Sequence, residues 1–423
     1  PAARHEQDTQ ERGARAPSGN NASLQYRTAR GAGALFPSLG ACGAEIVDAA
    51  HLQKDLRGRK NLRVKLGIDP TTPDLHLGHV VPLRVLKMFQ DAGHQAVLIV
   101  GDFTSRIGDP SGKSQTRRQL TPGEARANER TYRVQIGKVL DLRRTEIRHN
   151  SEWFGHMRLA DFLELLTHFS LKDAWERQDF HKRLSAGKTV ALHEAMYSVL
   201  QAYDSVAVRA NIEIGSLDQR LNLLAGRELQ QKLGRIPQDI VLTPYLIGLD
   251  GKAKMSKSVG NTVNLNDAPQ DMFGKVMSIP DALIINYAEL AAWLPPVEVR
   301  AIRRRLGRGE NPRDVKLDVA EAVTRLYHGS PAARRARGHF LKLFSRRDVS
   351  AAAPPVRLRP GSYSALKLLE ALGAAASRSQ ARRLIAGGAV EIDGRVAVRP
   401  NEPIRVRAGS TIRVGKKRFF RVR

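Results

Sequence analysis

The stretch Asp69-Pro70-Thr71-Thr72-Pro73-Asp74-Leu75-His76-Leu77-Gly78-His79 decides the fold, because an apolar run ends there, turn residues follow and a helix begins. A helix N-terminus carries unpaired N–H groups and a positive partial charge, so it binds anions such as phosphate. Gly78 would let a ligand approach the backbone, and His76 and His79 would share one face of the first turn. We therefore expect this turn to bind a nucleotide.

The apolar pattern around this turn predicts a βαβ unit. Residues 62–68 alternate like a strand, residues 80–92 show helical spacing, and residues 96–100 form the continuous apolar run of a buried parallel strand. Ligands bind at the carboxyl ends of such strands. Residues 44–56 read as a further helix, and residues 212–219 and 241–249 as further strands. We expect an α/β, Rossmann-like parallel-sheet domain over residues 36–278.

The rest of the chain changes character twice. Residues 279–345 show helical spacing throughout, including a helix over 311–328, and predict an α-helical domain. Prolines at 354, 355 and 360 mark residues 346–360 as a linker. Residues 361–423 mix helical and strand patterns and predict a small α+β domain. Residues 1–35 lack the apolar core of a signal peptide, and we expect them to be disordered.

The charge points to a polyanionic partner. The 423 residues hold 69 Lys+Arg against 42 Asp+Glu, or 69 − 42 = +27. Residues 351–423 hold 16 basic against 4 acidic residues, or 16 − 4 = +12. Basic groups lie there beside aromatic ones, which suits RNA binding, although a merely basic surface is the alternative. The residues concerned are Arg378, Arg382, Arg383, Lys416, Lys417 and Arg418.

The cysteine count and the length of the apolar runs bear on the compartment and on membrane association. Cys42 is the single cysteine, so the chain can form no internal disulfide and no thiolate zinc site, which suits a reducing cytosol. No run of about 18 apolar residues exists, so we expect no membrane span. We expect a cytoplasmic protein.

A second group of candidate binding residues lies on the helix predicted over 192–208. Tyr197, Gln201 and Asp204 are spaced i, i+4 and i+7, so they share one face. Such groups suit a hydrogen-bonding ligand when buried, whereas a polar face in water is the alternative. Asp218 follows a strand, where it could hold a ribose.

Cationic loops supply the third group. Lys254-Met255-Ser256-Lys257-Ser258 follows a core strand, where it could fold over phosphates. Lys113 and Arg117 follow the turn-rich residues 107–112 and could also reach a phosphate. A solvated loop is the alternative for each.

Together these motifs resemble the class I aminoacyl-tRNA synthetases, most closely the bacterial tyrosyl-tRNA synthetases. His76-Leu77-Gly78-His79 is similar to the family's HIGH signature, and residues 254–258 match its KMSKS signature. An H-x-G-H match alone would be weak. Residues 197–204 look like the family's YxxxQAxD amino-acid helix, Asp218-Gln219 like its GGxDQ turn, and residues 377–394 like its small RNA-binding domain, which tryptophanyl enzymes lack.

The resemblance implies a tyrosine–tRNA ligase that activates tyrosine with ATP and transfers it to tRNA(Tyr). It implies Mg²⁺ only as the companion of ATP, no protein-bound metal site, and a homodimer. The implied catalytic residues are His76, His79, Lys254, Lys257, Thr71, Lys113 and Arg117. Those implied to bind ATP are Gly67, Asp69, Gly78, Gly215, Asp218, Met255 and Ser256. Those implied to bind tyrosine are Tyr197, Gln201, Asp204, Asp109, Asn150 and Gln219.

The chain departs from the family pattern at a few positions. Many members have a tyrosine where this chain has Lys65, and Ser216, Leu217 and Asn211 also differ from the usual residues. These differences keep an alternative open: a synthetase-like RNA-binding protein with weakened or altered amino-acid activation.

Overall fold

The structure is a computed structural model. It describes residues 32–58, 61–111, 120–170, 178–344, 354–375, 377–397, 399–415 and 418–423. Most of the N-terminal stretch that we expect to be disordered lies outside these ranges. Its last residues do not fit that expectation, because helix α1 (Ala32–Ala41) begins at Ala32 and the Leu35 side chain is buried in the core. No helix among the described residues has both the length and the apolar character needed to cross a membrane.

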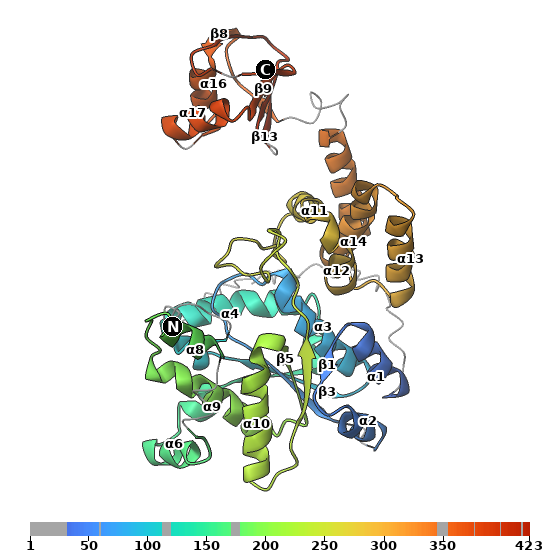
Figure 1. The fold of residues 1–423 in the computed structure, drawn as a ribbon, viewed down its shortest axis with the longest axis vertical. Helices are drawn as coiled ribbons and strands as arrows, with labels where there is room; N and C mark the ends of the chain where they lie inside the picture. Colours follow the sequence, from blue (N-terminus) through green and yellow to red (C-terminus); the bar gives the residue numbers. More distant parts are fainter. Residues whose placement is uncertain are drawn as a thin grey trace, which may run out of the picture.

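A six-stranded sheet lies at the centre of the N-terminal domain, in the order β1-β6-β5-β2-β3-β4 (Figure 1). All neighbouring strands are parallel except β1 and β6, which are antiparallel. The strands are β1 (Glu45–Ile46), β2 (Arg63–Ile68), β3 (Gln95–Val100), β4 (Thr145–His149), β5 (Ile212–Ser216) and β6 (Asp239–Thr243). The predicted α/β parallel-sheet fold is therefore confirmed.

Helices and short 3₁₀ turns connect these strands. The α-helices after α1 are α2 (Ala49–Gly58), α3 (Leu77–Asp91), α4 (Pro122–Ile136), α5 (Ser151–Phe154), α6 (Leu159–Leu166), α8 (Gln178–Ser185), α9 (Leu192–Ala207) and α10 (Arg220–Lys232). The 3₁₀ turns are η1 (Thr104–Arg106), η2 (Leu142–Arg144) and η3 (Leu217–Gln219). The single helix predicted over 44–56 is wrong at its start, because Ile46 pairs with Val241 in the sheet and α2 begins only at Ala49.

The two faces of the sheet differ. Alternate residues such as Val64, Leu66 and Leu98 join one large core with the apolar side of α3. The intervening residues face the other way, where Val97 and Ile99 form a small apolar cluster of their own. Helices α9 and α10 pack against each other. Residues of α9 also bond to the second face of the sheet, so α9 lies over it.

The helical domain contains α11 (Pro269–Met277), η4 (Asp281–Leu283), α12 (Ile284–Leu290), α13 (Pro296–Gly307) and α14 (Pro312–Phe344). Its buried residues belong to the same core as the sheet. The helix expected over 311–328 continues to Phe344, interrupted at Gly329, whose φ of 78° is non-helical. Gly329 and Pro331 are stop signals, but packing of the later turns, such as Phe340 on Phe273, sustains the helix.

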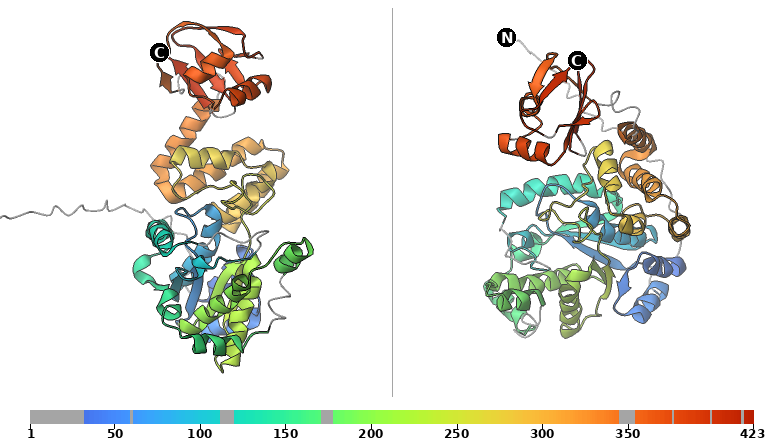
Figure 2. Two further views of the ribbon diagram at one scale, coloured as in Figure 1. Left: turned by 90° about the vertical axis from the view of Figure 1, so that its left-hand side faces the viewer. Right: turned by 45° about the horizontal axis from the view of Figure 1, so that its top comes forward.

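The C-terminal domain has a core of its own. A five-stranded sheet runs β10-β9-β12-β13-β7, β11 pairs with β8, and two helices pack alongside (red in Figures 1 and 2). The elements are β7 (Pro355–Val356), β8 (Gly361–Ser364), α16 (Ala365–Ala371), α17 (Arg378–Ala386), β9 (Val390–Ile392), β10 (Arg395–Val396), β11 (Pro403–Val406), β12 (Thr411–Val414) and β13 (Arg418–Val422). Strand β7 pairs with β13, so Pro355 and Val356, which we expect in the linker, belong to this domain.

Candidate active site

A pocket opens where β5 and β6 end and α3 begins. Three segments that are distant in sequence line it: the turn with His76 and His79, the turn with Asp218 and Gln219, and residues 254–256. Gly78, Asp109 and Ser216 also line it. The structure thus brings both candidate phosphate-binding motifs to one cavity at the carboxyl ends of parallel strands, as the βαβ argument predicts.

The two histidines of the first turn of α3 stack on each other. Their ring centroids are 3.8 Å apart, and the backbone N–H of His76 donates to Nδ1 of His79 at 3.3 Å. Backbone bonds fix this turn against the last part of the loop that carries Lys254 and Lys257, because Leu77 N–H donates to Val263 O and Leu265 N–H donates to Leu75 O, each at 2.9 Å. The N-terminus of α3 and the loop that carries Lys254 and Lys257 are therefore held together.

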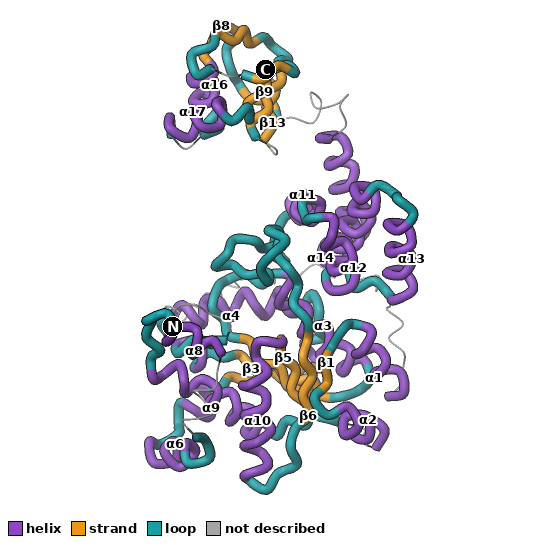
Figure 3. The backbone as a smooth tube through the Cα atoms, viewed as in Figure 1, coloured by secondary structure: helices purple, strands orange, loops and turns teal. Residues whose placement is uncertain are grey.

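The lysine loop itself, residues 244–268, runs without helix or strand between β6 and α11 (Figure 3). The buried Asn261 side chain shapes it by accepting from Ser256 N–H at 2.8 Å and donating to Asp250 at 3.1 Å. The sequence pattern missed Asn261, since no local signal shows where a loop amide will point. Met255 N–H donates to Leu246 O at 2.8 Å, which ties the loop to the end of β6.

The two signature lysines contact different segments of the chain. Lys254 pairs with Asp218, and its ammonium lies 5.5 Å from the ring centroid of Tyr245. Lys257 donates to the Thr72 hydroxyl and to the backbone oxygen of Asp74, so it contacts the turn before α3. Burial lowers the pKa of Lys257, and the Asp74 carboxylate opposes that shift. Lys257 follows Ser256 of the pocket lining but does not itself line the pocket, and neither does Thr71, whose N–H donates to Asp69 O at 2.8 Å.

The polar face of α9 is buried, so the alternative of a solvated face is excluded. The Tyr197 hydroxyl donates to Asp69 Oδ2 at 3.0 Å, and Thr104 donates to Asp69 Oδ1 at 2.9 Å. Gly101 is required here, because a Cβ at that position would lie 2.0 Å from Asp69 Oδ1. Asp69, at the end of β2, therefore links the helix mouth to α9.

Asp204 is a buried carboxylate on this face. Trp153 Nε1 donates to its Oδ1 at 2.9 Å, and Asn150 Nδ2 lies 3.4 Å from its Oδ2. Burial raises the pKa of Asp204 to about 7, opposed mainly by the Lys65 ammonium and then by the Trp153 and Asn150 bonds. Sequence reasoning missed Trp153, because only the folded chain brings α5 next to α9.

Gln201 does not share partners with Asp204. Its Nε2 donates to Glu213 at 3.0 Å, and its Oε1 accepts from Asn222 at 2.9 Å. The three residues of the predicted face therefore lie on one side of α9 but meet three separate sets of partners. Neither Glu213 nor Asn222 was among the predicted site residues.

The structure describes most of the remaining candidate residues but not all of them. Gly67 lies in β2 and Gly215 in β5, Asp109 accepts from Ser111 N–H at 2.9 Å, and Ser216 donates its hydroxyl hydrogen to Asp218. Lys113 and Arg117 lie outside the described residues. Asn211, one of the residues that differ from the family pattern, accepts from Arg63 N–H at 2.9 Å and so lies where β2 and β5 begin.

The basic residues of the C-terminal domain lie at its surface. Arg382 and Arg383 on α17 and Arg418 on β13 are exposed. Arg378, also exposed, pairs with Glu370 at 2.6 Å. Lys416 and Lys417 lie outside the described residues.

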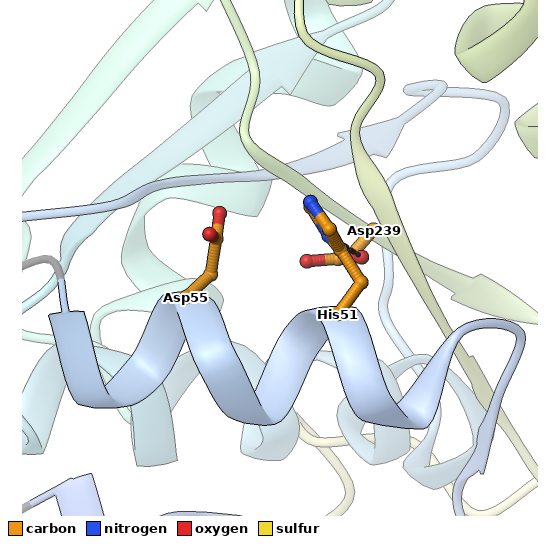
Figure 4. A group of neighbouring side chains, drawn as sticks. All are labelled: His51, Asp55 and Asp239. Atoms are coloured by element: carbon orange, nitrogen blue, oxygen red, sulfur yellow. Dashed lines mark hydrogen bonds and ion pairs between the residues drawn. The ribbon is translucent and has the colours of Figure 1, made fainter.

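One further cluster of ligand-type side chains lies away from the pocket. His51 and Asp55 of α2 face Asp239 at the start of β6 (Figure 4). His51 Nδ1 and Asp239 Oδ1 are 2.8 Å apart, and an Arg227 nitrogen is 3.7 Å from the same carboxylate oxygen. Because a guanidinium already neutralises the buried carboxylate, we interpret the cluster as an ion-pair network that joins α2 to the sheet.

Comparison with known proteins finds two family models that match different stretches of the chain. Residues 57–345 match the family described as tRNA synthetases class I (W and Y), and residues 366–409 match the S4 domain. The chain is 44% identical to a tyrosine–tRNA ligase of Moorella thermoacetica, over 88% of this chain and 91% of that protein. It is 43% identical to one of Thermotoga maritima, over 89% and 94%.

Among solved structures, the fold is similar to a C-terminally truncated mitochondrial tyrosyl-tRNA synthetase of Aspergillus nidulans. The TM-score is 0.61 at 20% identity, covering 73% of this chain and 94% of that one. A tyrosyl-tRNA synthetase from Archaeoglobus fulgidus, complexed with L-tyrosine, gives a TM-score of 0.58 at 22% identity and covers 72% and 100%. At these identities the likeness concerns the fold alone.

Proposed function

Because this chain belongs to the class I tRNA synthetases of the W and Y family, we propose that it is a tyrosine–tRNA ligase that forms tyrosyl-adenylate from tyrosine and ATP and transfers tyrosine to tRNA(Tyr). The observation that carries this proposal is the pocket that joins the His76–His79 turn to residues 254–256, with the buried polar face of α9 linked to it through Asp69.

The first step needs no general base. The substrate carboxylate is ionised at neutral pH and attacks the α-phosphorus of ATP, and the bond from that phosphorus to the bridging oxygen of pyrophosphate breaks. In the second step a ribose hydroxyl at the 3′ end of the tRNA attacks the tyrosyl carbonyl, and AMP leaves. Catalysis of the first step is therefore positioning and charge stabilisation.

We assign that task to the phosphate side of the site, by which we mean residues 70–79 and the lysine loop. His76 and His79 offer ring N–H donors at the helix mouth, and Lys254 and Lys257 offer ammonium groups from the facing loop. Both lysines now contact protein oxygens, so they would exchange these for phosphate oxygens when ATP binds. Mg²⁺ enters with ATP as part of the substrate.

The amino-acid side consists of Tyr197, Gln201 and Asp204 with their partners Asp69 and Asn150. We propose that Asp204 accepts a hydrogen bond from the substrate phenol, and that Tyr197 and Gln201 bind the region of its amino group. Burial supports this assignment, because a site built from buried hydrogen-bonding groups rejects an analogue that leaves them unpaired. Phenylalanine is that analogue for tyrosine.

The C-terminal domain would hold the tRNA. Exposed Arg382, Arg383 and Arg418 supply positive charge for its phosphates, and the S4 domain match supports RNA binding. We also propose that the ligase acts in the cytoplasm.

A second copy of the chain is a further proposed partner. Among the large apolar side chains that are exposed, Val134 lies on α4, Leu159 and Leu163 on α6, and Leu192 on α9, whereas others, such as Leu221 on α10, lie elsewhere. Helices α6 and α9 lie on the same side of the domain (left in Figure 1). A homodimer would cover such side chains. In sedimentation velocity, Leu159→Lys with Leu163→Lys should give a monomer, and Leu221→Lys on α10 a dimer. A wild-type monomer would contradict this proposal.

Pyrophosphate exchange measured with each of the twenty amino acids tests the proposed function. We expect exchange with tyrosine, followed by charging of tRNA(Tyr). Exchange with tryptophan instead of tyrosine would mean that the enzyme is specific for tryptophan. Tight RNA binding without exchange with any amino acid would favour the synthetase-like RNA-binding protein.

A further inference from the structure

Two opposite charges lie in the middle of the sheet face that packs against α9. Lys65 of β2 and Glu213 of β5 are register partners on neighbouring parallel strands, so their side chains stand side by side on one face. Neither side chain is accessible, at 0% and 1% exposed. The nearest positions on the adjacent strands β3 and β6 of this face are apolar: Val97, Ile99, Ile240 and Leu242.

The Lys65 ammonium has all three of its donors engaged inside the protein. It lies 2.9 Å from Glu213 Oε1, and it donates to Gln201 O at 3.0 Å and to Ser205 Oγ at 2.7 Å. It therefore acts on a substrate only through other residues. A buried ion pair is also weak evidence for stability, because apolar residues of similar volume are often as stabilising. The pair needs another explanation.

Most bonds of the pair go to α9, apart from the one that Gln238 Nε2, just before β6, donates to Glu213 at 2.5 Å. Gln201 and Ser205 are four residues apart on that helix, and Lys65 contacts both. Glu213 accepts from Gln201 Nε2 at 3.0 Å and from Ser205 Oγ at 3.0 Å. Since a carboxylate only accepts hydrogen bonds, Glu213 also determines which end of the Gln201 amide points toward the sheet.

We propose that Lys65, together with Glu213, is a positioning residue that fixes α9 on the sheet and thereby sets the discrimination of tyrosine from phenylalanine. This inference rests on the proposed function, in which Gln201 and Asp204 bind the amino acid. Lys65 also opposes the burial that raises the pKa of Asp204, so its charge helps to keep that carboxylate ionised.

The test compares purified full-length variants by pyrophosphate exchange. Lys65→Met with Glu213→Gln removes both charges and avoids leaving one buried charge unpaired. We expect the KM for tyrosine to rise about tenfold, as loss of about 1.4 kcal/mol of binding would cause. We expect kcat and the KM for ATP to stay near wild type, and the preference for tyrosine over phenylalanine to fall about as much as the KM rises.

A pH profile separates positioning from a general loss of stability. Lys65 ranks above Glu213 among the charges that act on Asp204, so removing both should raise the pH below which the KM for tyrosine increases. Ser205→Ala is a milder second variant that folds without any unpaired buried charge. It should raise the KM for tyrosine several-fold, in line with the loss of the two hydrogen bonds of the Ser205 hydroxyl.

Asp239→Asn is the matched control, because Asp239 is a buried carboxylate at the start of β6 that bonds to His51 of α2, away from α9. It should lower the melting temperature and leave the preference for tyrosine over phenylalanine unchanged. Wild-type KM, preference and pH profile in both folded Lys65 and Ser205 variants would overturn the inference alone. Failure of the wild-type protein to activate tyrosine would overturn the proposed function with it.

Discussion

The cations of the phosphate side lie on a loop and contact residues of other turns, whereas the groups of the amino-acid side are packed between the sheet and α9. Lys254 pairs with Asp218 and is about one-third exposed, and Lys257 contacts the turn before α3. Asp204 and Gln201 are buried and bond to neighbouring elements. From this difference we propose a division of labour, in which the loop cations stabilise the charge on phosphate and the buried site selects the shape and polarity of one side chain.

The largest expected effect is on the phosphate side. Lys257→Ala should lower kcat for pyrophosphate exchange by about 10²–10³, the cost of one lost donor to a charged transition state. The KM for tyrosine should change little, since α9 is untouched. Lys252→Ala removes the same charge from the same loop at an exposed position and should behave like wild type. Equal losses in both variants would mean that only the net charge of the loop matters.

This division also explains how much the sequence could predict. The local positions of the phosphate-side residues were predictable because each motif is contiguous: a strand end, a turn and a helix start hold His76 and His79, and one loop holds both lysines. Their role in phosphate binding stays a prediction. The strand, helix and strand around them have clear periodicity, so the α/β fold was predictable as well.

The amino-acid side was only half predictable. Helical spacing identified Tyr197, Gln201 and Asp204, but their partners Trp153, Glu213 and Asn222 come from other elements. One signal was present in the sequence, because Lys65 and Glu213 each interrupt an apolar strand, in Val64-Lys65-Leu66 and Ile212-Glu213-Ile214. Pairing them required knowing that β2 and β5 are neighbours, and no local pattern gives strand order.

The second prediction concerns the C-terminal domain, whose core is separate. Deleting residues 351–423 should reduce tRNA charging by about tenfold or more, because the lost phosphate contacts supply much of the affinity for RNA. Pyrophosphate exchange should stay near wild type. Parallel assays of both reactions on one preparation measure this, and equal loss of both would contradict the modular organisation.

A smaller effect is expected from Asp204→Asn. The isosteric amide keeps the volume but removes the charge that would accept the phenol hydrogen bond, so kcat/KM for tyrosine should fall about tenfold. Activity toward phenylalanine should change little, since that side chain has no hydroxyl. Pyrophosphate exchange with both amino acids measures the ratio, and an unchanged ratio would place the phenol elsewhere.

The smallest expected effect is on the pH dependence. Asp204 has a pKa raised to about 7, so it is ionised above that pH and protonated below it. If the ionised form accepts the phenol hydrogen bond, the KM for tyrosine should rise several-fold as the pH falls from 8 to 6. The KM for phenylalanine should stay flat over this range, and so should that of Asp204→Asn for tyrosine.

The division of labour is tested most directly by the ratio of kcat/KM for tyrosine to that for phenylalanine, measured side by side in wild type, Lys257→Ala and Asp204→Asn. We predict that Lys257→Ala lowers both values together and leaves the ratio unchanged, whereas Asp204→Asn reduces the ratio about tenfold. A ratio that falls in Lys257→Ala, or one that survives in Asp204→Asn, would contradict the account.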